Sequence, residues 1–180
     1  MTEKEKFIIS TSNDIQSLSV DCLTSLMEQH IVDDAERVDI KLSFYSIMEF
    51  NALFYTYFDM LLFSKNLHQY RSVFYSSFFD TCKYNSLLWN KELTIQYFDS
   101  LIEEMAVIIK DLMNKEKFAP RVISFSRRIL FTLKNDIPFD KELYYIKANA
   151  FDVLFLSLFI PEYITIVLEG ANFFIKQLQE

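Results

Sequence analysis

Glycine and proline are scarce in this chain. Of its 180 residues only Gly170 is a glycine, and the prolines are Pro120, Pro138 and Pro161. Tight β-hairpins and phosphate-binding loops depend on glycine for positive φ angles and for close approach of the backbone. The Walker loop, the dinucleotide-binding fingerprint and the nucleophile elbow each need several glycines at fixed spacings. The sequence therefore excludes these three sites and predicts helices joined by short polar turns.

Histidine and cysteine, which ligate most protein-bound zinc, are also rare. Neither His30 nor His68 belongs to a Glu-x-x-His or His-x-x-x-His pair of the kind that binds iron or zinc on a helix. Cys22 and Cys82 are 60 positions apart and form no Cys-x-x-Cys motif, so we expect free, buried thiols. The sequence thus predicts no metal site, no cofactor and no catalytic residues, and we expect a protein that is not an enzyme.

Long uncharged apolar runs are missing too, since a membrane-spanning helix needs roughly 18 such residues. The most apolar stretch, 151–175, is interrupted by Asp152, Pro161, Glu162 and Glu169. We interpret it as two buried helices separated at Pro161. The polar N-terminal residues do not resemble a secretory signal. Because free thiols fit a reducing compartment, we expect a cytoplasmic protein, either of the producing cell or of an infected host cell.

Aromatic residues are abundant. Hydrophobic residues make up 51% of the chain, with 19 phenylalanines and 10 tyrosines. This composition excludes disorder and predicts a wide, aromatic core. The preference for Phe, Tyr, Ile, Asn and Lys over Gly, Ala, Pro and Arg follows A/T-rich codons, which indicates a low-GC bacterium, a phage or a large DNA virus as the source.

Helical periodicity predicts the fold. Apolar stripes and breakers, Asn66 among them, place helices at about residues 14–30, 39–64, 67–88, 91–114 (with Asn90 as its N-cap), 120–134, 140–159 and 161–177. The fourth helix has the clearest seam of a packed helix pair, because apolar residues repeat at alternating spacings of three and four. These residues are Phe98, Leu101, Met105, Ile108 and Leu112. We expect an all-α fold, a compact bundle of about six or seven helices in one domain spanning 1–180, with residues 1–13 as a loosely ordered N-terminal arm.

The net charge of −7 is confined to the first third of the chain. Residues 1–60 carry 11 acids and 4 bases, whereas residues 61–180 carry 14 of each. A one-sided field of this kind steers association with a partner of opposite charge. The acids are densest at residues 28–39, and the candidate partner-binding residues are Glu28, Asp33, Asp34, Glu36 and Asp39. The expected partner is a protein with a basic patch.

A smaller basic cluster lies between residues 115 and 134. Its candidate patch residues are Lys117, Arg121, Arg127 and Arg128. Bases interleaved with phenylalanines can bind nucleic acid, but the acidic pI of about 4.9 favours a solvated helix face. An acidic patch on a partner protein is the third interpretation, and a second copy of this chain, forming a homodimer, is one candidate partner.

Carboxylates and tyrosines within the most aromatic helix call for two further expectations. A buried carboxylate has a raised pKa and can act as an acid or a base, but we interpret Glu49 and Asp59 as the solvated edge of their helix. The hydroxyls of Tyr45, Tyr55 and Tyr57 need water or a partner, so some of them should line a groove, an interface or a wet pocket.

These observations favour a non-catalytic protein–protein interaction module that blocks or sequesters a partner protein. Viral or phage host-interaction factors and bacterial toxin-neutralising proteins share this architecture, an argument by analogy. The alternative is a helical regulatory protein that binds an apolar small molecule in an aromatic-lined pocket. An enzyme using isolated carboxylates is the third hypothesis. Neither nucleic acid nor a membrane is expected as a partner.

Overall fold

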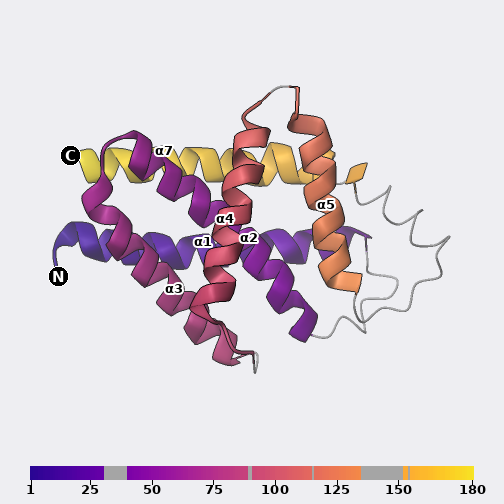
Figure 1. Ribbon diagram of the computed structural model, residues 1–180, viewed down its shortest axis with the longest axis horizontal. Coiled ribbons are helices and arrows are strands. Elements are labelled where there is room, and N and C mark those ends of the chain that lie inside the picture. Colours follow the sequence, from indigo (N-terminus) through magenta and orange to yellow (C-terminus); the bar gives the residue numbers. More distant parts are fainter. Residues whose placement is uncertain (31–39, 89–90, 115, 135–151, 154) are drawn as a thin grey trace.

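The computed structural model describes residues 1–30, 40–88, 91–114, 116–134, 152–153 and 155–180. Over these residues the protein is an all-α bundle, as the sequence predicts (Figure 1). Its elements are α1 (Glu3–His30), α2 (Ile40–Ser64), the short 3-10 turn η2 (His68–Tyr70), α3 (Arg71–Leu88), α4 (Ile95–Leu112), α5 (Phe118–Lys134), the π-helical segment η3 (Phe155–Ile164) and α7 (Thr165–Gln179). Within the described part, none of the helices is long and apolar enough to cross a membrane.

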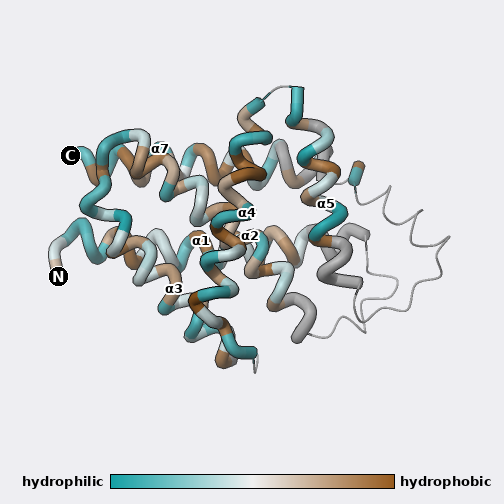
Figure 2. Tube along the Cα trace, in the orientation of Figure 1, coloured by the Kyte–Doolittle hydropathy of each residue, from teal (hydrophilic) through white to brown (hydrophobic). Residues whose placement is uncertain are grey.

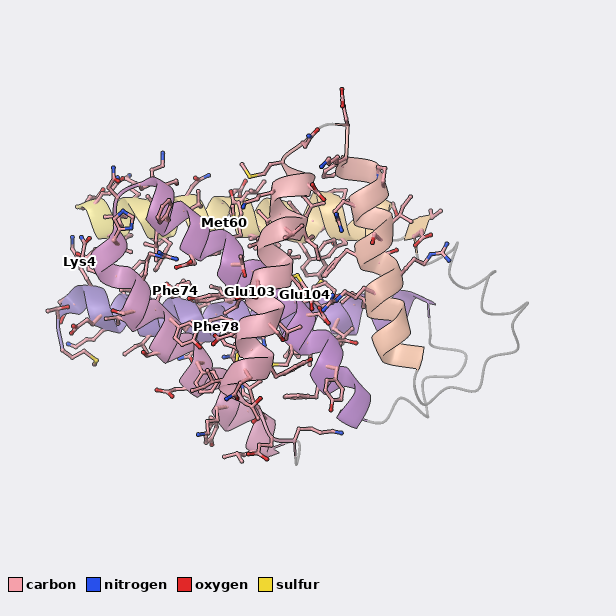
Figure 3. The ribbon with its side chains drawn as sticks, viewed as in Figure 1. Lys4, Met60, Phe74, Phe78, Glu103 and Glu104 are labelled. Atoms are coloured by element: carbon pink, nitrogen blue, oxygen red, sulfur yellow. The ribbon has the colours of Figure 1, made fainter. Side chains whose placement is uncertain are left out.

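Helix α2 occupies the centre of the bundle and contacts α1, α3, α4, α5 and α7. Helices α1 and α7 cross the view of Figure 1 in opposite directions, so both chain ends lie at the same end of the molecule. There the Lys4 ammonium donates a hydrogen bond of 2.8 Å to the Leu178 carbonyl. Lys4 is labelled at this end in Figure 3.

Phenylalanine and tyrosine rings fill the core, which confirms the expected aromatic interior. The ring of Tyr55 on α2 stacks on Phe74 of α3, with ring centroids 4.9 Å apart. The Phe174 ring of α7 lies 5.4 Å from Phe58 and 5.4 Å from Phe74. Rings from the consecutive helices α2 and α3 and from the distant α7 therefore meet in one cluster.

The seam of α4 is confirmed as core. Four of its five apolar residues are buried and Leu112 is half-buried. Figure 2 shows hydrophilic and hydrophobic residues alternating along this helix. Asp99 and Glu103, expected on the opposite side of the helix, are exposed. The alternating spacing thus identifies which face of α4 packs against α2.

The expected N-terminal arm is wrong, because α1 begins at Glu3. Thr2 and Glu5 form a reciprocal cap at its start. The Glu5 amide donates to Thr2 Oγ1 over 3.2 Å, and the Thr2 amide donates to Glu5 Oε2 over 2.6 Å. This is the capping-box pattern of Thr-x-x-Glu, which satisfies two otherwise unpaired amides. Ile8, within the proposed arm, is fully buried.

Asn90 is not the N-cap of α4. The helix begins at Ile95, and its N-cap is Thr94, whose Oγ1 accepts a hydrogen bond of 3.2 Å from the Tyr97 amide. Leu93, just before this cap, is buried. Residues 91–94 are not helical, and α4 starts only after the buried Leu93.

Pro161 does not open the last helix, contrary to the prediction. It lies inside the π-helical segment η3, which continues directly into α7. Proline lacks an amide hydrogen and its ring clashes with the carbonyl four residues earlier in an α-helix. A π turn pairs residues five apart and so accommodates the proline without ending the helix. The preceding predicted helix falls on residues 140–159, of which 140–151 and 154 lie outside the described residues.

The predicted break at Asn66 is confirmed. Its φ of 58° is left-handed, a conformation usually assigned to glycine. The Leu67 amide donates to the Leu62 carbonyl over 2.9 Å, and the Asn66 amide donates to the Phe63 carbonyl over 3.1 Å. This pair of bonds is a Schellman motif with the buried Leu62 and Leu67 as its hydrophobic contact. Asparagine thus ends α2 where the chain has no glycine.

Candidate functional site

An apolar groove of about 260 Å³ lies between α2, α4, the start of α5, and the η3–α7 segment. Among the residues that the structure describes, ten line it: Leu53, Phe54, Tyr57, Ile109, Leu112, Met113, Phe118, Ile164, Val167 and Leu168. Three of them are aromatic and none is charged, and the Tyr57 hydroxyl is the one side-chain oxygen or nitrogen in the lining. The groove is therefore suited to a neutral, apolar guest.

The groove has a buried floor and an open rim. Leu53, Phe54 and Val167 are buried, whereas Met113 and Leu168 are exposed at the rim. Burial raises the pKa of the half-buried Tyr57, so its hydroxyl stays neutral. The sequence prediction that some tyrosines of α2 line a groove is confirmed for Tyr57, while Tyr55 packs in the core.

An ion-pair cluster closes the α4–α5 connection beside the groove. Asp111, next to the groove residue Leu112, accepts a hydrogen bond of 3.2 Å from Lys117 and a second from Arg121. Hydrogen bonds from Arg121 and then from Lys117 hold the pKa of Asp111 below its ordinary value. Because Lys117 precedes Phe118, this cluster fixes the first turn of α5 against the groove.

Arg128 joins three helices. Its guanidinium on α5 donates two hydrogen bonds to Glu49 of α2, with N–O distances of 2.7 and 2.8 Å, and a third to Glu104 of α4. Figure 3 labels Glu104 beside Glu103 on α4. Glu49 is 4% exposed. Burial raises its pKa above the ordinary glutamate value, although hydrogen bonds from Arg128 act in the opposite direction.

Arg127, the next residue, contacts a second buried carboxylate. Its Nε donates to Asp152 Oδ2 over 2.8 Å, and the buried Ser126 hydroxyl donates to the same carboxylate. Asp152 is buried as well. The charged residues that interrupt the apolar C-terminal stretch thus include one that pairs with α5.

The four predicted basic-patch residues are all engaged within the fold. Lys117 and Arg121 contact Asp111, Arg127 contacts Asp152, and Arg128 contacts Glu49 and Glu104. The interpretation of this segment as a solvated helix face misses these pairs.

Neither of the two carboxylates expected at a solvated edge is freely exposed. Glu49 is buried, and Asp59 forms a bidentate pair with Arg71, with N–O distances of 2.6 and 2.7 Å. The sequence interpretation placed both acids at the solvated edge of an amphipathic helix, but each is paired with an arginine from another helix, Arg128 or Arg71.

Most of the acidic segment, residues 28–39, lies outside the part of the chain that the structure describes. Asp33, Asp34, Glu36 and Asp39 lie outside the described residues, and Glu28 belongs to the last turns of α1.

The structure shows both cysteines, Cys22 and Cys82, free and buried, as expected. In the part of the chain that the structure describes, no three histidine, cysteine, aspartate or glutamate side chains come together as ligands for a metal.

Comparison with known proteins adds no relative: no protein family, curated protein or solved structure matches this chain.

Proposed function

We propose that this chain is a non-catalytic binding protein that holds a neutral, apolar small molecule in the groove between α2, α4 and α7. The observation that carries the proposal is the lining itself, whose ten described side chains bear no charge and one hydroxyl. Apolar surface removed from water contributes about 25 cal/mol per Å². A rigid floor that is already in place loses little conformational freedom when a guest binds.

The exposed rim supports this assignment. Met113 is 73% exposed and Leu168 is 40% exposed, although both contribute apolar surface to the groove. A guest that covers them removes this surface from water. The Tyr57 hydroxyl offers one hydrogen bond, enough to orient a guest that carries a single polar group.

The experiment uses N-phenyl-1-naphthylamine, a neutral dye whose fluorescence rises in apolar surroundings. Titration of the full chain should give saturable fluorescence, which an excess of 1-dodecanol should displace. Leu168→Glu places a charge at the rim of the groove and should weaken dye binding by at least about tenfold, since charges are costly in apolar sites.

Ile166→Glu is the matched control. Ile166 is also an aliphatic residue of α7 and is 50% exposed, but it does not line the groove. This variant should bind the dye as the unaltered chain does. Absence of saturable dye binding, or equal loss in both variants, contradicts the proposal.

A protein-interaction module remains the second candidate function, and the charge asymmetry supports it. Residues 1–60 carry the whole net charge of −7, and residues 28–39 hold its densest part. Such a field favours a basic protein partner. Affinity capture on the immobilised chain at low and at high salt tests this hypothesis, because steering by exposed charges is screened as salt rises.

A further inference from the structure

Helices α1 and α7 form an antiparallel pair on one side of the bundle. At one end the Phe7 ring of α1 packs edge-on against the Phe173 ring of α7, with ring centroids 6.1 Å apart. At the other end the Tyr163 hydroxyl, just before α7, donates a hydrogen bond of 2.6 Å to Ser25 Oγ of α1. Figure 1 shows the two helices running in opposite directions. They therefore lie side by side between these two contacts and share an outer face.

An apolar stripe runs along the α7 half of this face. Ile166 is 50% exposed and Phe173 is 57% exposed, and residues seven positions apart lie on the same side of a helix. Gly170, between them, is exposed as well. Its φ is not positive, and the atom nearest to an added Cβ lies 4.0 Å away on the Phe58 ring, so packing within the fold does not require a glycine. Glycine destabilises a helix interior, and close approach of another chain to the backbone is one reason to keep it.

Acidic residues border the stripe on both helices. Asp14 of α1 and Glu169 of α7 are exposed, and each lies between the two contacts that join the helices, at a similar height along the pair. Neither forms an ion pair with a residue that the structure describes. The adjoining sequence is acidic throughout, since residues 7–30 and 155–175 contain five acids and no lysine or arginine.

A second acid on each side extends these borders. Burial raises the pKa of the Tyr163 hydroxyl, and the carboxylates of Glu162 and Asp21 act in the same direction, so both lie near this hydroxyl. Asp21 is seven positions after Asp14, and Glu162 is seven positions before Glu169. Each side of the face thus carries a row of two acids about 10 Å apart, at about 1.5 Å per residue.

These features fit a basic amphipathic helix as the occupant. On such a helix, lysines or arginines seven positions apart are also about 10 Å apart and on one side, so they match the spacing within each row of acids. Its apolar stripe can cover Ile166 and Phe173 while its charged edges meet the acids. The same acids repel nucleic acid and anionic membrane surfaces.

We propose that the α1–α7 face binds a basic amphipathic helix of a partner protein, with the apolar side of that helix on Ile166 and Phe173 and its lysines or arginines against the two rows of acids. The proposal rests on the second candidate function, the protein-interaction module, and gives the basic partner a place in the fold. It does not depend on the groove.

The probe is a fluorescently labelled peptide of about 18 residues, five helical turns, built from leucine, lysine and alanine. Its leucines form one helical stripe, and its lysines lie on both edges of that stripe. Fluorescence anisotropy at low salt should show saturable binding to the full chain, and added salt should weaken it. Two control peptides should bind at least about tenfold more weakly: one with glutamate in place of lysine, and one of the same composition whose leucines are scattered around the helix.

A pair of charge variants locates the acids that matter. Asp14→Asn/Glu169→Gln removes one acid from each row and should weaken binding of the lysine peptide by at least about fivefold. Glu92→Gln/Glu103→Gln is the matched control, because it removes the same charge from exposed acids before and within α4. The control should change the affinity by less than about twofold.

A pair of apolar variants tests the stripe in the same assay. Ile166→Ser should weaken peptide binding by at least about fivefold, because it removes exposed apolar surface from the face. Val107→Ser, at a residue of α4 that is 55% exposed, should bind as the unaltered chain does. Circular dichroism verifies that each variant is folded.

The outcomes separate this face from the function on which it rests. Absence of saturable binding of the lysine peptide contradicts both. Binding that persists in the Asp14/Glu169 variant or in Ile166→Ser overturns the α1–α7 face alone, since the basic partner then has another surface. Equal binding of the scattered peptide, co-sedimentation of the chain with phosphatidylserine vesicles, or self-association that Ile166→Ser abolishes means a different occupant and also overturns the proposal.

Discussion

Removing the Arg128 side chain should destabilise the protein strongly at neutral pH. Arg128→Met keeps much of the aliphatic volume but removes the guanidinium that contacts Glu49 twice and Glu104 once. Glu104 is half-exposed and loses little, because exposed ion pairs contribute about 0–1 kcal/mol. Glu49, with its side chain 5% exposed, is left as a buried charge without a partner.

Breaking a buried pair by removing one partner costs about 3–5 kcal/mol. In a domain of this size each kcal/mol lowers Tm by about 2–4 °C, so a decrease of about 6–20 °C is expected. The double variant Glu49→Leu/Arg128→Met replaces the pair by apolar groups. The stability of this double variant should lie within about 1 kcal/mol of that of the unaltered chain or be higher, since such replacements are often neutral or stabilising.

The pH dependence gives the prediction a second readout. Because burial raises the native pKa of Glu49 above its unfolded value, the folded state holds this proton more tightly than the unfolded state. The resulting stability is fully present below the ordinary glutamate pKa of about 4.3 and is lost as pH rises through the native value. Without Arg128 the native pKa rises further. The difference in unfolding free energy between Arg128→Met and the unaltered chain should therefore widen as the pH is raised from about 4.5 to 7.5.

Urea unfolding followed by circular dichroism at several pH values measures both effects. Lys117→Met is the control, because Lys117 is 62% exposed and its partner Asp111 keeps Arg121. It should change stability by less than about 0.5 kcal/mol. If Arg128→Met costs no more than this control, or if its cost does not depend on pH, the argument about the buried carboxylate is refuted.

Three further expectations concern substitutions elsewhere in the chain. Met105→Ala should cost about 2–5 kcal/mol in urea unfolding, since Met105 is fully buried in the α4 seam, and a cost below about 0.5 kcal/mol would contradict this. Gly170→Ala should raise stability by about 0.5–1 kcal/mol, because Gly170 is exposed within α7, lacks a positive φ, and leaves an added Cβ 4.0 Å from Phe58. Neutralising Asp33, Asp34 and Glu36 together should slow association with a basic partner at low salt more than it speeds dissociation. An unchanged on-rate in a variant that precipitates more readily leaves these acids a role in solubility alone.

Local sequence patterns predict the helices of this protein well where an apolar stripe is strong. The seam from Phe98 to Leu112 and the break at Asn66 depend on neighbours within a few positions, and both are confirmed. The start of α1 depends on two polar residues, Thr2 and Glu5, instead of a stripe. Their Thr-x-x-Glu spacing is readable in the sequence, and a search for capping boxes would have extended the first helix.

The candidate sites could not be predicted in this way, because they join residues far apart in the chain. Arg128 and Glu49 are separated by 79 positions, and Tyr163 and Ser25 by 138. No periodicity within a helix encodes which carboxylate an arginine meets across the bundle. The excess of tyrosine hydroxyls on α2 was the one sequence signal for the groove, and it indicated a groove without locating it.

Aromatic packing alone specifies the position of α5 only weakly. Ring pairs in this core range from nearly parallel, at 2° for Tyr75 and Phe79, to nearly perpendicular, at 86° for Phe50 and Phe125, so a phenylalanine face accepts many partners. Bidentate arginine–carboxylate bonds accept far fewer geometries.

Three arginines of α5 make directional ion pairs: Arg121 with a single bond to Asp111 at the end of α4, and Arg127 and Arg128 with bidentate bonds to Asp152 and to Glu49 of α2. Together these ion pairs fix the position of α5 along its axis and its rotation about that axis. The first residue of α5, Phe118, forms one wall of the groove. We infer that the basic residues of this segment act first as internal braces, and that the groove owes its shape to them.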